Sequence, residues 1–285
     1  MINPGVFFTV VYPQALLYLS DVRESALAQT RKDFDVVVVN DGCDKQQIAE
    51  ELRGLHLTIL EADGGFSGNR IQGINYARRN GYQYILFCDA DDSFTANRYE
   101  RTIEVFDECR TDIVVCNLNI VDKELKPIIC DYFNTELPVS QLIDTDFIKD
   151  KNIFGMSNTA IRLAALKDDI LIPETHIVDW YLFTLLLQQG LKAQYITDSL
   201  VNYRQYESNM IGINKFDIAS FRRLTALKHN HYKMLSEAGF SQYEQPRQVC
   251  EALQALADAE IENIIKQELS IHPHPLWWQI ITENN

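Results

Sequence analysis

The sequence predicts an α/β fold: a mostly parallel β-sheet with helices on both faces, followed by a helical extension. Short apolar runs alternate with helix-like stretches through the first half of the chain, which is the pattern of a sheet built from strand–helix–strand units. Most of these runs are continuously apolar, as expected for strands that are covered on both faces. After about residue 206 the apolar runs stop and helical periodicity replaces them.

The N-terminal half contains the predicted strands of the sheet. Five apolar runs supply them, at residues 6–12, 35–40, 55–60, 82–88 and 112–121. Between the third and fourth strands, apolar residues recur at close to helical spacing over about 66–80, and Gly81 stands where a helix would stop. Such alternation favours parallel pairing, because each helix carries the chain back to the start of the next strand.

The pattern changes after the fifth strand. Residues 122–157 mix polar and apolar residues without a sustained period, which predicts a long excursion over the sheet. Regular structure returns with a helix over 178–189, stopped by Gly190, and with strand-like pieces within 193–204.

The C-terminal part reads as two amphipathic helices, at 216–238 and 242–268. The strands end before them, so we place a domain boundary near residue 206. This predicts one α/β domain over 1–206 and a helical extension over 207–285.

Composition limits the possible partners. The chain has 285 residues and 46% hydrophobic residues, enough for a sizeable core. Its formal net charge of −14 repels nucleic acid and anionic lipid, so we expect no nucleic-acid partner. An anionic ligand would need local neutralisation, for instance by a metal. Six cysteines without a CxxC pair predict a reduced, cytoplasmic protein.

Membrane contact is expected to be peripheral at most. No apolar run approaches the ~20 residues that cross a bilayer, and the N-terminus lacks the pattern of a signal peptide. Trp277 and Trp278 would dock on the protein itself, on a partner or on a membrane interface, and packing within the protein is favoured.

Polar residues gather where three of the predicted strands end. Asn40–Gly42 follows the second strand, Asp63–Gly65 the third and Asp89–Asp92 the fourth. Ligands of open parallel sheets bind beyond the carboxyl ends of the strands, so we expect the binding site there. Asp and Gly are also common turn residues, which leaves a purely structural role open for the first two segments.

The acidic cluster after the fourth strand is the strongest signal of chemistry. Asp89, Asp91 and Asp92 repel one another at the end of a buried strand, and their ionised forms are costly there without a cation or several donors. A hard divalent ion such as Mg²⁺ prefers oxygen ligands and uses one or two carboxylates together with substrate phosphates. The alternative is an N-cap for a helix beginning near Thr95, made by Asp92 or Ser93 while Asp91 binds the metal.

The motifs "VVVVNDG", "GGFSGNRIQGINYARRNGYQYILFCDADD" and "VDWYLFTLLLQQG" together resemble the inverting family-2 glycosyltransferases with the GT-A fold, over roughly residues 6 to 212. The resemblance implies transfer of a sugar from a nucleotide diphosphate donor to a hydroxyl of a glycan or glycolipid acceptor, in the assembly of a surface polysaccharide or glycolipid. It implies Mn²⁺ or Mg²⁺ as cofactor and a location at the inner face of the cell membrane. Residues of about 1–121 would bind the donor, and those of about 122–206 the acceptor.

The resemblance also assigns roles to the strand-end residues. Asp41 would contact the nucleoside. The triplet Asp89-Ala90-Asp91 would contact the ribose and the metal on the diphosphate. Asp91 would be the principal metal ligand, with Asp89 beside it.

Four further residues complete the implied site. Asp179, at the start of a late helix, would be the general base. Gly65 and Arg70 would lie against the donor, with Arg70 at its phosphates. Arg204 would face either a carboxylate or the diphosphate, and the resemblance favours the diphosphate.

The sequence departs from the family pattern at four places. Tyr12-Pro13 stands where the first strand usually ends in a Pro-Thr-Tyr-Asn-like turn, and Gly68-Asn69-Arg70 stands where an Ala-Arg-Asn triplet commonly follows the third strand. Val178 stands where the family has a Glu before the base, and Tyr206 stands where many relatives have a His near the metal, which leaves the third metal ligand unassigned. Two alternatives stay open: a non-catalytic module that binds nucleotide sugars or glycans, and a nucleotidyltransferase, which usually carries a Gly-rich basic loop that "VVYPQALLY" lacks. The sugar, the base, the linkage and the oligomeric state are left open.

Overall fold

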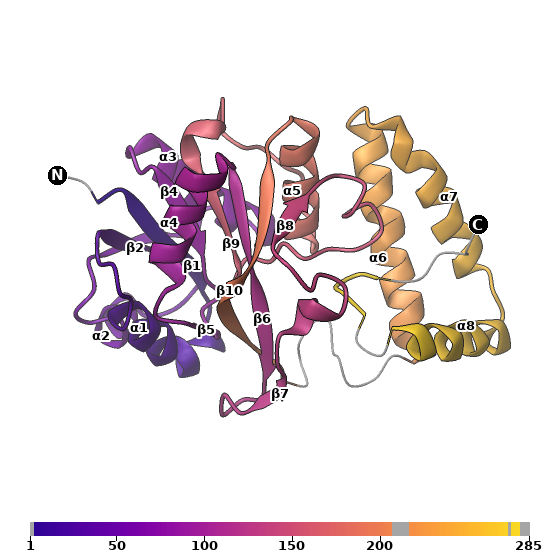
Figure 1. Cartoon of the computed structure of the whole chain (residues 1–285), viewed down its shortest axis with the longest axis horizontal. Helices are drawn as coiled ribbons and strands as arrows, with labels where there is room; N and C mark the ends of the chain where they lie inside the picture. Colours follow the sequence, from indigo (N-terminus) through magenta and orange to yellow (C-terminus); the bar gives the residue numbers. More distant parts are fainter. Residues whose placement is uncertain (1–2, 207–216, 273–274, 280–285) are drawn as a thin grey trace. The chain divides into compact units, whose positions relative to one another are not determined.

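A computed structural model describes residues 3–206, 217–272 and 275–279 of the chain (Figure 1). The chain forms two compact units. The first contains residues 1–144 and 154–204, and the second contains residues 145–153 and 205–285. The boundary at 204/205 lies close to the predicted one, and the short segment 145–153 is grouped with the C-terminal residues.

A single β-sheet forms the centre of the first unit (Figure 1). Its strand order is β3-β2-β1-β4-β9-β6-β10-β5, with β7 beside β6 and β8 beside β10. The strands are β1 Gly5–Val11, β2 Phe34–Asn40, β3 Leu57–Glu61, β4 Tyr84–Phe87, β5 Ser93–Phe94, β6 Ile113–Val121, β7 Pro127–Ile129, β8 Gln141–Ile143, β9 Thr159–Arg162 and β10 Ala193–Arg204.

The prediction of a mostly parallel sheet is confirmed. Strands β1 to β4 pair in parallel, and so do β6 and β10. Strand β9 is antiparallel to both of its neighbours, β4 and β6, and joins the two parallel parts. The sequence analysis did not single out β9, because four residues are too few to show a period.

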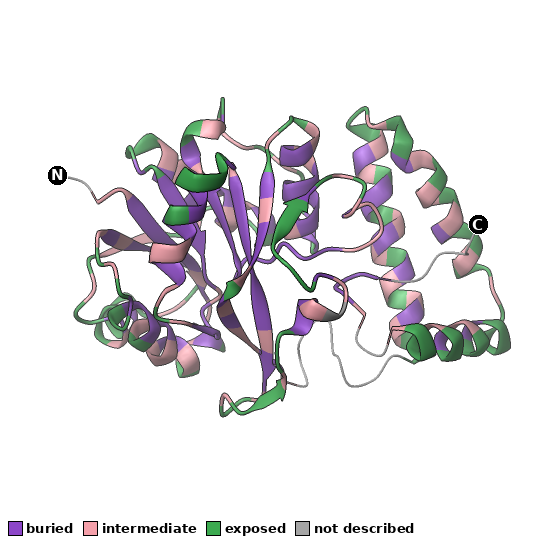
Figure 2. Ribbon diagram, in the orientation of Figure 1, coloured by how far each residue is buried: buried purple, intermediate pink, exposed green. Residues whose placement is uncertain are grey.

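The helices cover the sheet and explain the continuous apolar runs. They are α1 Leu19–Leu27, α2 Lys45–Glu51, α3 Phe66–Arg79, α4 Arg98–Cys109 and α5 Val178–Gln188. Helix α3 packs against β1 and β2, and α4 packs against β6 and β10. Strands β1, β2, β4, β6 and β9 are largely buried as a result, as Figure 2 shows, whereas β3 at the edge of the sheet is mostly half-buried.

The predicted helix ends agree closely with the structure. Helix α3 ends at Arg79 and α5 at Gln188. Gly81 and Gly190 follow with φ of +82° and +90°, a left-handed conformation that L-residues with a side chain rarely adopt.

The predicted N-cap near Thr95 is wrong. Helix α4 begins at Arg98 and is preceded by Asn97, which makes no side-chain cap. Ser93 belongs to β5, which pairs with β10, and Asp92 accepts a hydrogen bond from the backbone of Arg204. Both residues are therefore held by the sheet and cannot reach the helix.

The second unit is helical, as predicted, with α6 Ile218–Glu237, α7 Glu244–Gln254 and α8 Asp258–Ile271. A small apolar core of Phe221, Ile261 and Ile265 joins α6 to α8. The first of the two predicted helices corresponds to α6. The second, over 242–268, is wrong, because the chain breaks there into α7 and α8.

Polar contacts stabilise this break. Arg222 of α6 donates to the carbonyl oxygen of Gln254 (3.1 Å), the last residue of α7, and to that of Leu256 (3.0 Å) in the connection to α8. The backbone N–H of Ala257 donates to the Glu260 carboxylate (2.8 Å) and starts α8. The helical spacing of apolar residues continues across the break between α7 and α8. The sequence pattern therefore could not reveal the break.

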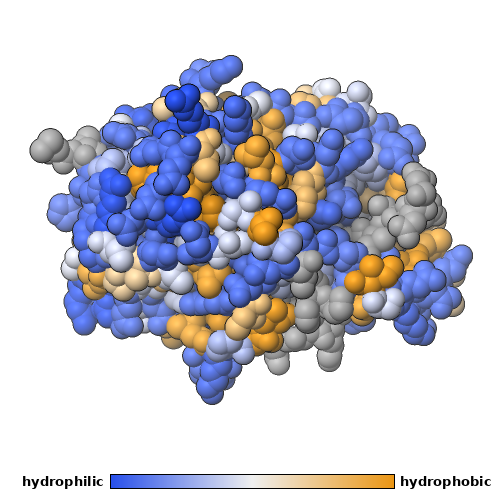
Figure 3. Space-filling model, in the orientation of Figure 1, coloured by the Kyte–Doolittle hydropathy of each residue, from blue (hydrophilic) through white to orange (hydrophobic). Residues whose placement is uncertain are grey.

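The tryptophans near the C-terminus pack within the second unit. Trp277 and Trp278 are each 5% exposed, and the Trp277 carbonyl accepts a hydrogen bond from the backbone of Asn152 (2.7 Å). Among the described residues, no helix is both long and apolar enough to cross a membrane. On the face drawn in Figure 3, hydrophilic residues predominate and apolar atoms form scattered patches.

The close packing of α3 on β1 leads to a testable prediction. A Cβ atom on Gly73 would lie 2.0 Å from the ring of Phe8, which is buried in β1. We expect Gly73→Ala to lower the free energy of unfolding by about 1–3 kcal/mol, because the ring has no space to move into. The control is Gly68→Ala in the same helix, where a Cβ would meet nothing within 4 Å and should stabilise by up to about 1 kcal/mol. Urea unfolding measures both, and equal stability of the two variants would contradict this packing.

Candidate active site

Asp41 lies at the edge of the sheet where β1, β2, β3 and β4 end. Its backbone N–H donates to the carbonyl of Val11 at the end of β1 (2.8 Å). The buried Asn40 side chain accepts from the N–H of Cys43 (2.8 Å) and donates to Glu61 (3.0 Å). These bonds fix the turn, so the exposed Asp41 carboxylate is presented to solvent at this edge.

The acidic turn after β4 is largely buried. Asp91 and Asp92 are 9% and 1% exposed, and Asp89 is half-buried. The Tyr12 hydroxyl, from the loop after β1, donates to Asp91 at 3.4 Å. Carboxylates in this environment need compensation, and two buried arginines supply part of it.

Arg98 and Arg204 are those arginines. The Arg98 guanidinium donates to the carbonyl of Phe87 and lies 5.0 Å from the ring centroid of Phe94. The Nε of Arg204 donates to the carbonyl of Asp91 (2.6 Å), and its backbone N–H donates to the Asp92 carboxylate (2.8 Å).

The diphosphate contact favoured for Arg204 is not supported by this geometry. Its guanidinium is buried and also donates to the Lys123 carbonyl and to the Asp21 carboxylate. These bonds direct it into the protein, so Arg204 holds the turn in shape. The carboxylate alternative left open by the sequence describes it correctly.

Burial changes the protonation of the turn. It raises the pKa of Asp89 to about 6, an effect opposed by the charge of Arg70 and increased by the charge of Asp91. The pKa of Asp92 lies well above its usual value, first because of burial and then because of the neighbouring carboxylates. A bound cation would favour the ionised forms and relieve this cost.

The residues of the turn fit a divalent cation in part. They offer hard carboxylate oxygens, and Oδ2 of Asp92 is buried without a hydrogen-bond partner. Within the described residues, no group of three His, Cys, Asp or Glu side chains converges as a complete metal site. A cation held here would therefore take its remaining ligands from water or substrate, as Mg²⁺ commonly does.

Asp179 occupies the first turn of α5. Its carboxylate accepts a hydrogen bond from the N–H of Trp180 (2.8 Å). Burial raises the pKa of Asp179 to about 7; the Trp180 hydrogen bond and the charge of Arg70 oppose this, and the charge of Asp89 adds to it. Asp179, Asp89 and Arg70 thus lie within electrostatic range of one another, although they are far apart in sequence.

Arg70 lies one turn into α3. Its guanidinium donates to the Phe66 carbonyl (2.9 Å) and stacks over the Phe66 ring, 3.9 Å from the centroid. Its positive charge acts on both Asp89 and Asp179. Arg70 is thus within electrostatic reach of both the acidic turn and α5, and its positive charge is of the kind that binds a phosphate.

Gly65 immediately precedes α3, where a side chain would meet another part of the protein. A Cβ on Gly65 would lie 2.9 Å from the Glu174 carboxylate, which accepts a hydrogen bond from the N–H of Ser67 (3.1 Å). Glu174 thus engages the N-terminus of α3, a position that favours anions. Glu174 and Arg98 could not be recognised from the sequence, because nothing in their local sequence indicates such distant contacts.

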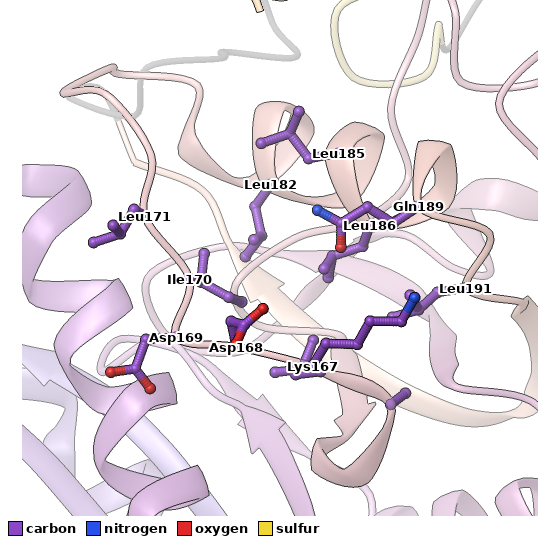
Figure 4. A pocket seen from close by; sticks show the side chains of 12 residues that line it. Lys167, Asp168, Asp169, Ile170, Leu171, Leu182, Leu185, Leu186, Gln189 and Leu191 are labelled. Carbon is purple, nitrogen blue, oxygen red and sulfur yellow. The ribbon is translucent and has the colours of Figure 1, made fainter.

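The first unit also has a cavity away from the sheet edge that carries the predicted site residues. One cavity of about 480 Å³ lies between α5 and the segment that precedes it, lined by leucines such as Leu182 and Leu186 and by the charged Lys167 (Figure 4). None of the predicted site residues lines it. Tyr206 falls in the second unit, and residues 207–212 of the predicted motif lie outside the described residues.

Comparison with known proteins agrees with the fold. The fold is that of two solved structures. S. aureus TarS 1–349 in complex with UDP-GlcNAc shares 18% identity, with a TM-score of 0.59 over 95% of this chain and 81% of that one. The mannosyltransferase PcManGT of Pyrobaculum calidifontis, in complex with GDP-Man and Mn²⁺, shares 16% identity, with a TM-score of 0.57 over 95% and 75%. The predicted GT-A fold is confirmed.

Sequence relatives are bacterial. The minor teichoic acid biosynthesis protein GgaB of Bacillus subtilis is 26% identical over 212 residues, which are 70% of this chain and 23% of that protein. The matches span only 23% to 38% of the length of three such relatives. A family model described as glycosyl transferase family 2 matches residues 9–168, more than half of the chain. The chain therefore belongs to glycosyl transferase family 2.

Proposed function

We propose that the chain is a metal-dependent, inverting glycosyltransferase that moves a sugar from a nucleotide diphosphate sugar to a hydroxyl acceptor. The observation that supports the proposal is that Asp89 in the acidic turn, Arg70 of α3 and Asp179 of α5 act on one another electrostatically, although they are far apart in sequence. Two structures of the same fold contain nucleotide sugars, one of them with Mn²⁺. The relative named for teichoic acid biosynthesis supports a role in making a surface glycan or glycolipid.

Each residue of the donor site has a part to perform. Asp91, with Asp89, would hold Mn²⁺ or Mg²⁺, which neutralises the leaving diphosphate when bound. Asp41 would contact the nucleoside, and the loop Asp89-Ala90-Asp91 the ribose. Arg70 would contact the phosphates. Gly65 would lie against the donor through its backbone, because the Glu174 carboxylate fills the space where its side chain would be.

Asp179 would act as the general base. The acceptor oxygen attacks the anomeric carbon, its proton passes to the Asp179 carboxylate, and the bond from that carbon to the diphosphate oxygen breaks. Attack on the face opposite the leaving group inverts the anomeric centre. Burial keeps the pKa of Asp179 near 7, so the carboxylate is a stronger base than an ordinary Asp and is still substantially ionised at neutral pH.

Hydrolysis of the donor separates this proposal from the alternatives. A module that only binds nucleotide sugars or glycans would be stabilised by them without turnover. A nucleotidyltransferase would release or consume pyrophosphate. UDP-GlcNAc and GDP-mannose are the first probes, because structures of the same fold contain them. Metal-dependent release of UDP or GDP is the result that supports a transferase.

The first prediction concerns the metal. Asp91→Asn removes one charge from a cluster of like charges, so the fold should persist. The variant should lose the rise in thermal midpoint that UDP-GlcNAc or GDP-mannose gives with Mn²⁺. Asp168→Asn, an exposed aspartate away from the site, is the control and should keep that rise. Stabilisation of the wild type that is equally large in EDTA would contradict a metal role for Asp91.

The second prediction concerns the base. Asp179→Asn keeps the shape of the side chain but cannot accept a proton. Turnover should fall by about 100-fold or more, with donor affinity nearly unchanged. Steady-state release of the nucleoside diphosphate measures both quantities, and NMR of the product identifies its anomer. Normal turnover, or a product that retains the donor configuration, would remove Asp179 from the mechanism.

The third prediction concerns pH and the stability of the metal-free protein. Because the pKa of Asp179 rises from 3.8 unfolded to about 7 folded, its favourable contribution is complete below about pH 4 and is lost as the pH rises through 7. Asn lacks this titration. Asp179→Asn should therefore gain stability relative to wild type between pH 4 and 7, by at most about 1.4 kcal/mol per pH unit. Parallel urea curves across this range would show that Asp179 is not held in a costly environment.

A further inference from the structure

Residues 163–177, here called the strap, run along α3 toward the start of α5. Near the end of α3, the strap residue Asp169 forms ion pairs with Arg78 and Arg79. Further along, Ile170 bonds Asn75, and Thr175 bonds Ser67 in the first turn of α3. The strap thus runs opposite to α3, from its last turn to its first.

Of the hydrogen bonds that join the strap to α3, those of Ser67 lie nearest to Asp179 along the chain. Its hydroxyl donates to the Thr175 carbonyl (3.0 Å) and accepts from the Thr175 N–H (2.9 Å), and all of these atoms are buried. The backbone N–H of Ser67 also donates to the Glu174 carboxylate (3.1 Å). A single residue, 1% exposed, therefore fixes two consecutive positions of the strap.

The residues between Thr175 and Asp179 are also held by a hydrogen bond and by burial. The Thr175 hydroxyl accepts from the N–H of Ile177 (3.3 Å), and the side chains of Ile177 and Val178 are buried. Asp179 follows directly in the first turn of α5. The Ser67–Thr175 bonds therefore tie the first turn of α3 to the segment that leads directly into Asp179.

Arg70 lies in α3, the helix to which Ser67 joins the strap. It lies three residues after Ser67 in α3, and its charge acts on both Asp179 and Asp89. The Ser67–Thr175 bonds therefore connect the helix that carries Arg70 to the segment that carries Asp179. Transfer in line requires these two groups to be held in register across the sugar.

We propose that Ser67 is a positioning residue: its double hydrogen bond to Thr175 sets Asp179 against the donor side of the site. This inference rests on the proposed function, in which Asp179 is the base. Glu174 assists by bonding the Ser67 N–H, and the absence of a side chain at Gly65 leaves the space that Glu174 occupies.

The test compares Ser67→Ala with Asn75→Ala. Asn75 makes the same kind of double bond, donating to the Ile170 carbonyl (3.0 Å) and accepting from its N–H (2.9 Å), but farther from Asp179 along the strap. Both variants should lower the thermal midpoint. With UDP-GlcNAc or GDP-mannose and Mn²⁺, Ser67→Ala should lower kcat for hydrolysis about 10-fold with KM within about 2-fold, and Asn75→Ala should change kcat by less than about 2-fold.

Glu174→Ala keeps the test decisive if Ser67→Ala does not fold. Glu174 is exposed and its loss leaves the buried pair intact. We expect kcat to fall about 3-fold with KM unchanged. Asp169→Asn, which weakens the strap at the far end of α3, is the matched control and should keep normal kcat.

Three results would overturn the inference. Equal losses of kcat in Ser67→Ala and Asn75→Ala would mean that the strap matters only for stability. A rise in KM at constant kcat would place Ser67 on the donor-binding side. If the wild type hydrolyses neither nucleotide sugar, the proposed function is contradicted, and the positioning role with it. This result is distinguishable from the first two, because no variant would then show activity.

Discussion

The burial of several carboxylates at the end of β4 is the constraint on which the first unit depends. Ionised carboxylates are costly away from water unless cations and donors surround them. Arg204 contributes its backbone N–H to the Asp92 carboxylate, and its guanidinium joins the backbone of the turn to α1 and to the residues after β6. Arg98 approaches from α4. Helices α1 and α4 and strand β10 are thereby fixed relative to the acidic turn. The carboxylate oxygens of the turn are held in place for a ligand.

Much of this architecture follows from local sequence. Strands β1, β2 and β4 are largely buried, so continuous apolar runs reveal them, and glycines with positive φ mark the ends of α3 and α5. Strand β9 and the break between α7 and α8 depend instead on distant partners, β4 and β6 in one case and Arg222 in the other. Local periodicity contains no information about such partners, so these features could not be predicted.

The same distinction applies to the site. The acidic turn could be found from the sequence because three adjacent carboxylates are mutually repulsive wherever they are placed. Asp179 is one ordinary aspartate before an apolar helix, and only the family resemblance singled it out. The direction of Arg204, the compensation by Arg98 and the contact of Glu174 with α3 are set by tertiary structure. These three features are seen only in the folded structure, where distant strands and helices pack against one another.

The antiparallel insertion of β9 also affects the order in which the sheet can be completed. Strands β1 to β4 are all made before the chain reaches β6, yet β4 meets its second neighbour only when β9 has been synthesised. Pairing over such a long sequence separation is slow. During synthesis on the ribosome, the free edge of β4 therefore remains open to wrong pairing until the later strand arrives, which makes the interval between them the period of greatest risk of aggregation.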